Sequence, residues 1–78
     1  MKFALADVVL IRRLLTPVRD VDGDSAEPPQ PRLGELGTVT ASVGDDLYLV
    51  EHATDDGRSL WVAEFHAEEL ALVDRPTP

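Results

Sequence analysis

LYLVEHATDDGRSLWVAEF, residues 47–65, is the stretch that decides the fold of this chain. Its two ends, residues 47–53 and 59–65, are rich in Val, Leu and aromatic residues and have the length of β-strands. Between them lies TDDGR, in which Asp56 and Gly57 favour a hairpin turn because both residues tolerate positive φ. The stretch therefore predicts two antiparallel strands joined by a tight turn.

Two further strands are expected on the N-terminal side of this hairpin. Residues 38–43 (TVTASV) have strand composition and lie between the turn sequences GELG at 34–37 and GDD at 44–46. Residues 8–11 (VVLI) form a continuous and mostly β-branched apolar run, which is typical of a buried strand.

On the C-terminal side, residues 66–70 (HAEEL) predict one helical turn and residues 71–73 a short closing strand. The sequence thus predicts an all-β domain of five short strands, with one helical turn before the last strand. Closing such a sheet into a small barrel removes most of its exposed edges, so we expect a barrel.

A long polar loop, residues 16–33, separates the first strand from the second. It contains four prolines and three aspartates: Pro17, Pro28, Pro29, Pro31, Asp20, Asp22 and Asp24. Because proline cannot donate to a β-ladder, we expect no central strand here and a flexible loop. We expect residues 1–74 to form a single domain and residues 75–78 to be a disordered tail.

Acidic residues outnumber basic ones. Fifteen Asp and Glu face seven Lys and Arg, which gives a formal net charge of −8. Binding to phosphate backbones needs the opposite balance, so the charge disfavours nucleic acid. It favours a basic protein partner, whose encounter an acidic surface accelerates. Solubility alone explains the charge equally well.

The chain has no cysteine, which excludes disulfides and thiolate metal sites and favours a reducing cytoplasm. Asp7, Arg12 and Arg13 interrupt the apolar N-terminal stretch, so neither a signal peptide nor a membrane span is expected.

The motifs that carry chemistry are incomplete. Asp20, Asp22 and Asp24 have the spacing of a calcium loop, but Ser25 and Pro31 occupy the places of its glycine and glutamate. His52 and His66 have no second histidine or cysteine at ligand spacing, and no serine lies in a nucleophile motif. We therefore expect no enzymatic activity, no metal and no cofactor.

The aromatic residues allow two interpretations. Tyr48, Trp61 and Phe65 could stack on nucleic-acid bases, but core or hairpin packing explains them better given the charge. Alternation along residues 47–53 assigns two faces. These are Tyr48, Val50 and His52 on one side, and Leu49, Glu51 and Ala53 on the other. The strand around Trp61 is apolar on both faces, so Trp61 lies either beneath the long loop or at an interface.

The order of several short motifs resembles the DUF4926 family of small bacterial proteins. The motifs are Asp7-Val8-Val9, Gly34-Glu35-Leu36-Gly37-Thr38-Val39, Tyr48-Leu49-Val50-Glu51, Asp55-Asp56-Gly57-Arg58 and Ala67-Glu68-Glu69-Leu70. The resemblance implies an SH3-like barrel, and an immunity or antitoxin role beside a toxin-like partner.

Together these observations predict a non-catalytic acidic protein-binding module that covers a basic, toxin-like protein. Its expected contact residues are Asp45, Asp46, Leu49, Glu51, Asp55, Asp56 and Trp61. Two alternatives stay open: a KOW-like nucleic-acid-binding regulatory module, and an accessory subunit of a metalloenzyme.

Overall fold

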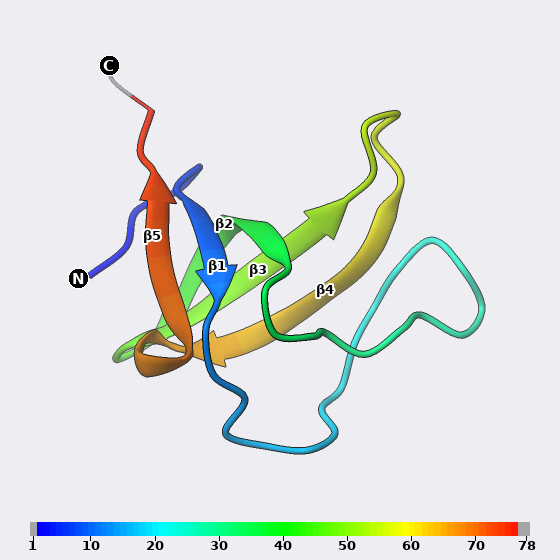
Figure 1. Ribbon diagram of the computed structural model, residues 1–78, viewed down its shortest axis with the longest axis horizontal. Helices are drawn as coiled ribbons and strands as arrows, with labels where there is room; N and C mark the ends of the chain where they lie inside the picture. Colours follow the sequence, from blue (N-terminus) through cyan, green and yellow to red (C-terminus); the bar gives the residue numbers. More distant parts are fainter. Residues whose placement is uncertain (1, 77–78) are drawn as a thin grey trace.

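Five antiparallel strands form one sheet in the computed structural model, which describes residues 2–76 (Figure 1). The elements are β1 Val8–Ile11, β2 Leu36–Gly44, β3 Leu47–Ala53, β4 Ser59–His66, the 3-10 helix η1 Ala67–Glu69, and β5 Leu70–Asp74. The strand order across the sheet is β4-β3-β2-β1-β5. The all-β class, the five strands and the single helical turn before the last strand are confirmed.

The predicted hairpin consists of β3 and β4, which pair from Leu47 opposite His66 to Ala53 opposite Ser59. Its turn differs from the expected one. Gly57 has a φ of 89°, whereas Asp56 does not enter the left-handed region. The carbonyl of Thr54 accepts the Gly57 N–H at 2.9 Å, and the Thr54 N–H donates to the Arg58 carbonyl at 2.9 Å. The turn therefore contains one residue with positive φ, Gly57, whereas the sequence predicted a turn that uses both Asp56 and Gly57 in this way.

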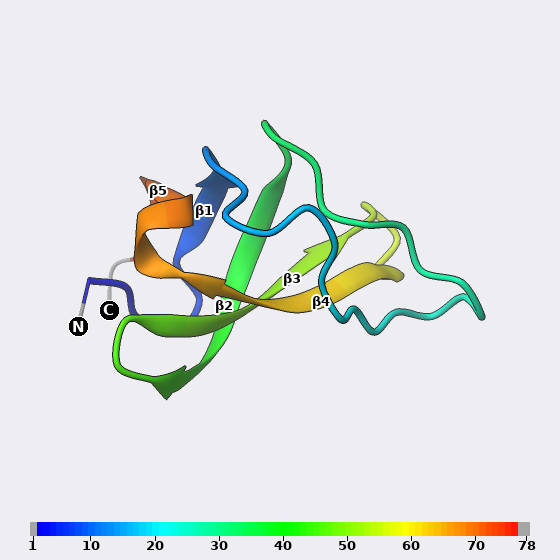
Figure 2. The same cartoon turned by 90° about the horizontal axis from the view of Figure 1, so that it is seen from below.

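Strand β2 connects the two halves of the sheet. Its first residues, Leu36 to Thr38, pair with β1, and the stretch from Thr38 to Gly44 pairs with β3. Register shifts at Thr40 and Val43 interrupt the β2–β3 ladder, as β-bulges do, and bulges bend a strand. Figures 1 and 2 show β1 and β5 lying at a large angle to β3 and β4, so the sheet curves around its core.

The core consists of side chains on the concave side of this sheet. Its largest fully buried members are Trp61, Tyr48, Phe65 and Ile11. The rings of Trp61 and Phe65 lie 5.5 Å apart, and Phe3 contacts Tyr48 edge-on at 5.3 Å. Strand β3 alternates as expected, with Tyr48 and Val50 buried and Leu49 and Glu51 half-buried on the other face.

The long loop between β1 and β2 runs along the outer edge of β4. Asp22 and Val62 exchange two backbone hydrogen bonds, at 3.0 and 2.7 Å. A Cβ atom on Gly23 would lie only 2.6 Å from the Leu60 carbonyl oxygen, so this close approach requires glycine. The loop is therefore in direct contact with β4, while its expected flexibility stays a prediction.

Residues 75–78 were expected to be a disordered tail, which stays a prediction, and the first of them, Arg75, contacts the domain. The Arg75 guanidinium donates to both carboxylate oxygens of Asp7, at distances from 2.8 to 3.2 Å. It also donates to the Lys2 carbonyl at 3.2 Å. A buried carboxylate requires a countercharge, and Arg75 provides it. Residues 77–78 lie outside the described residues.

Candidate protein-binding surface

Four of the five acidic residues expected to bind a partner lie at the two ends of β3, and the fifth, Glu51, lies within the strand (Figure 1). Asp45 and Asp46 form the turn between β2 and β3, and Asp55 and Asp56 belong to the turn between β3 and β4. At about 3.3 Å per residue, the seven residues of β3 separate the two turns by roughly 20 Å. The structure therefore divides the expected site into two acidic ends.

The turn containing Asp45 and Asp46 is fixed by its backbone. Asp46 has a φ of 53°, a conformation that Asp tolerates better than most residues. Its carbonyl accepts a hydrogen bond from the Ala67 N–H at 2.8 Å, which ties the turn to η1. Both side chains are exposed, and with Ser42 and Gly44 they line a shallow hollow.

At the other turn the two acids differ. The Asp56 carboxylate accepts hydrogen bonds from the Thr54 hydroxyl and the Arg58 N–H. These bonds lower its pKa, the Thr54 hydroxyl contributing most. Asp56 therefore organises the turn, whereas the exposed Asp55 side chain lies at the margin of a groove.

That groove has a volume of about 330 Å³ and lies on the outer face of β1, β2 and β3. Its lining residues are Val8, Leu36, Gly37, Thr38, Glu51, His52, Ala53 and Asp55. Two of the expected contact residues, Glu51 and Asp55, thus share a groove with apolar neighbours. Leu49, two residues from Glu51 on the same face, is half-buried between Ala41 and Glu64.

Trp61 does not belong to the surface, and its expected role in partner contact is wrong. Its side chain is 0% exposed and packs between the rings of His52 and Phe65. The indole N–H donates to the Glu35 carboxylate at 3.2 Å, which satisfies its one polar atom. Because Tyr48 and Phe65 are also buried, none of these three aromatic side chains is available for base stacking.

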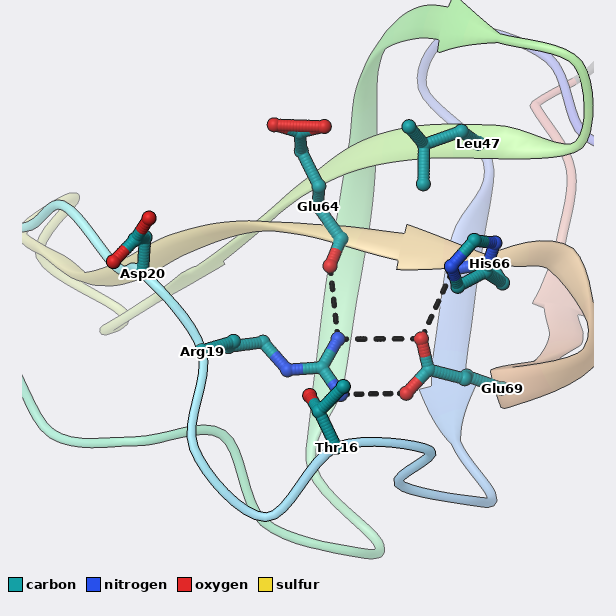
Figure 3. A pocket seen from close by; sticks show the side chains of 7 residues that line it. All are labelled: Thr16, Arg19, Asp20, Leu47, Glu64, His66 and Glu69. Atoms are coloured by element: carbon teal, nitrogen blue, oxygen red, sulfur yellow. Dashed lines mark hydrogen bonds and ion pairs between the residues drawn. The ribbon is translucent and has the colours of Figure 1, made fainter.

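A second hollow, of about 300 Å³, contains a buried ion pair that the sequence did not indicate (Figure 3). Arg19 of the long loop donates to both carboxylate oxygens of Glu69, at 2.6 and 3.2 Å. It also donates to the Glu64 carbonyl at 2.8 Å and lies 4.2 Å from the centre of the Phe65 ring. The Arg19 guanidinium therefore adds a side-chain anchor to the backbone bonds that join the long loop to β4.

The Glu69 carboxylate is fixed from the other side by backbone donors. The N–H groups of Leu15 and His66 each donate to it at 2.9 Å. The second bond is the backward contact of a capping box, in which the third residue of a helix reaches the residue before its start. Burial alone would raise the pKa of Glu69, but the bonds from Arg19, Leu15 and His66 outweigh it and lower the pKa. Glu69 is therefore ionised at neutral pH and is not poised for proton transfer.

The side chains of His52 and Asp24 make structural contacts. His52 places one ring nitrogen 2.6 Å from the Leu36 carbonyl and the other 3.3 Å from the Glu35 carboxylate. Asp24 accepts the Ser59 N–H at 2.9 Å. Within residues 2–76, no three His, Asp or Glu side chains are grouped to hold a metal ion. Nor does any helix there have the length and apolarity needed to cross a membrane.

Sequence reasoning missed Arg19, Glu69 and Arg75, because each acquires its role from a residue at least 50 positions away.

No family model, no curated protein and no solved structure matches this sequence.

Proposed function

We propose that this chain is a non-catalytic, acidic protein-binding module whose partner is a basic protein. The observation that carries the proposal is how the charges are distributed. Asp7 and Glu69 are the two buried acids, whereas the other acidic side chains are exposed or half-buried. Two of the seven cations, Arg19 and Arg75, are committed to those buried carboxylates. Because these two acids and two arginines pair with one another, the remaining thirteen acidic and five basic residues carry the whole net charge of −8.

The finer architecture belongs to the same proposal. An SH3-like barrel is supported by the strand order, in which β1 lies between β2 and β5. The long loop after β1 and the helical turn before β5 also support it. Barrel modules of this size act through their surfaces, because a 78-residue chain has little room for an internal cleft.

The proposed mechanism is occlusion of the partner. The exposed carboxylates at the two turns would oppose basic residues, and Leu49 and the groove would provide apolar contact. The resemblance to the DUF4926 family supports an immunity or antitoxin protein in the cytoplasm, with a toxin-like partner. A KOW-like nucleic-acid module is less well supported, because the chain is acidic and the side chains of Tyr48, Trp61 and Phe65 are buried.

Affinity capture with the tagged chain tests the proposal, using lysate of the native cell at low and high salt. We expect a basic protein that remains bound at 0.05 M NaCl and is released by about 0.5 M, because rim charges act through screened electrostatics. Capture of RNA or DNA instead would support the nucleic-acid alternative. Copurification of a large metal-containing enzyme would support the accessory-subunit alternative.

A further inference from the structure

The groove on the outer face is built from one row of paired residues across three strands. Val8 of β1 lies opposite Thr38 of β2, and Thr38 lies opposite Glu51 of β3. Residues two positions along each strand share a face, so Leu36 and Ala53 lie beside this row. Leu36, the first residue of β2, is 46% exposed. The apolar side chains of Val8, Leu36 and Ala53 therefore form part of the groove, beside the polar residues Thr38 and Glu51.

Carboxylates line the groove on its β3 side. The two acidic residues among its lining residues are Glu51 and Asp55. No lysine or arginine is among the lining residues. The Glu51 carboxylate accepts a hydrogen bond from the Ser59 hydroxyl, which carries no charge. The negative charge at the groove is therefore not neutralised by the groove's own residues.

The two buried carboxylates indicate what chemistry fits here. Asp7 and Glu69 are each matched by an arginine whose guanidinium contacts both carboxylate oxygens. A guanidinium presents a planar set of donors and is more weakly hydrated than an ammonium group. Its aliphatic stem can lie on apolar surface while its charged end reaches carboxylates. An arginine side chain thus matches both the apolar side chains and the carboxylates of the groove.

We propose that this groove binds an extended segment of the basic partner through one arginine side chain. The stem of that arginine lies over Val8, Leu36 and Ala53, and its guanidinium is received by Glu51 and Asp55. The volume is at the lower end of the range for ligand sites, which suits one or two side chains rather than a folded surface. The inference rests on the proposed function and specifies the partner's chemistry.

Chemical-shift mapping on the ¹⁵N-labelled full chain tests the inference, with a capped Val-Thr-Arg-Val-Thr peptide as the probe. We expect shifts concentrated at Val8, Leu36, Thr38 and Ala53. The same peptide with citrulline, which is neutral and nearly isosteric with arginine, should bind at least tenfold more weakly. The E51Q/D55N variant should bind the arginine peptide about tenfold more weakly, whereas the matched control D45N/D46N should stay within twofold of the parent chain.

We expect the E51Q/D55N variant to fold, because E51Q keeps an acceptor for the Ser59 hydroxyl and Asp55 is exposed. The folding of each variant is checked independently of peptide binding. The inference is overturned if the citrulline and arginine peptides bind equally, or if D45N/D46N weakens binding while E51Q/D55N does not. The latter result would show that the basic segment binds at the turn with Asp45 and Asp46, and it would be compatible with the proposed function. If no arginine-peptide binding occurs although a basic protein is captured from lysate, the groove assignment alone fails.

Discussion

The ion pair between Glu69 and Arg19 and the one between Asp7 and Arg75 use the same functional groups in different surroundings. Both carboxylates are buried, and both arginines contact two carboxylate oxygens. The Arg19 side chain is 11% exposed and lies over Phe65, whereas the Arg75 side chain is 50% exposed. Water can therefore hydrate part of the Arg75 guanidinium, but it hardly reaches the Arg19 guanidinium.

The two pairs also connect different parts of the chain. Arg19 holds the long loop to η1 and β4, and Gln30 fixes its backbone through hydrogen bonds of 3.0 and 2.8 Å. Arg75 joins the segment after β5 to the segment before β1. Because both carboxylates are buried and only the arginines differ in exposure, we expect the desolvation of the arginine to separate the energies of the two pairs.

Glu69→Ala should have the largest effect on stability. It leaves the Arg19 guanidinium desolvated without a countercharge and removes the acceptor for the Leu15 and His66 N–H groups. We expect the free energy of unfolding to fall by about 3–5 kcal/mol in urea denaturation, enough to unfold a marginally stable small domain. Glu68→Ala is the control, because Glu68 makes an exposed contact of 3.8 Å with Arg13. Equal unfolding midpoints for the two variants would contradict the prediction.

Asp7→Asn should have a smaller effect, of about 1–2 kcal/mol in the same measurement. The amide keeps one acceptor for the Ala4 N–H, which donates to Asp7 at 2.8 Å. Water reaches the freed Arg75 side chain because half of it is already exposed. A loss as large as that of the matched substitution Glu69→Gln would show that exposure of the arginine does not distinguish the two pairs.

Acid should destabilise the protein through both carboxylates. The pKa of Asp7 is lowered mainly by the hydrogen bonds from Arg75, and the pKa of Glu69 is lowered despite its burial. A carboxyl group with a lower pKa in the folded state contributes stability above its unfolded pKa and loses it as the pH falls through its folded pKa. The free energy of unfolding should therefore decline progressively below about pH 5.

Urea midpoints measured at several pH values between 7 and 3 provide this test. Glu69→Gln and Asp7→Asn should each decline less steeply with acid than the parent chain. Asp56, whose pKa is also lowered, contributes equally in all three proteins, so the differences between them are informative. Parallel curves for the three proteins would refute the assignment.

Salt should give the smallest effect and sharpen the comparison further. Raising NaCl from 0.1 to 1 M shortens the screening length from about 10 to about 3 Å. Screening acts on exposed charge, so the cost of Asp7→Asn should shrink by a few tenths of a kcal/mol, and the cost of Glu69→Gln should stay constant. A larger salt effect on the Glu69 variant would mean that Arg19 is accessible to ions in solution.

Local patterns predicted most of the fold. Strand composition placed β3 and β4, and Gly57 marked their turn correctly. The two ion pairs were not predictable, because they join residues 50 and 68 positions apart and no local pattern records them. Glu69 looks like any acidic residue of an exposed helical turn until Arg19 lies against it.

The sequence predicted the acidic charge of the candidate surface and the residues of 47–53 that share its face, but it did not predict the groove. Leu49 and Glu51 share the outer face as expected. The groove depends on Val8 lying beside Thr38, a pairing that only the folded sheet establishes. Trp61 was ambiguous, because the apolar character of both strand faces does not reveal that the loop through Asp22 pairs with Val62.

The Asp7–Arg75 pair also has a mechanical consequence. It lies where the chain enters β1 and leaves β5, and these two strands are antiparallel neighbours (Figure 1). A stretching force applied through the segments before Asp7 and after Arg75 would load this pair first. It would then separate β1 from β5 one residue pair at a time, from Val8 opposite Asp74 onward. Such peeling resists force far less than shearing all the bonds together, so the domain should unfold at low tension when pulled from its ends.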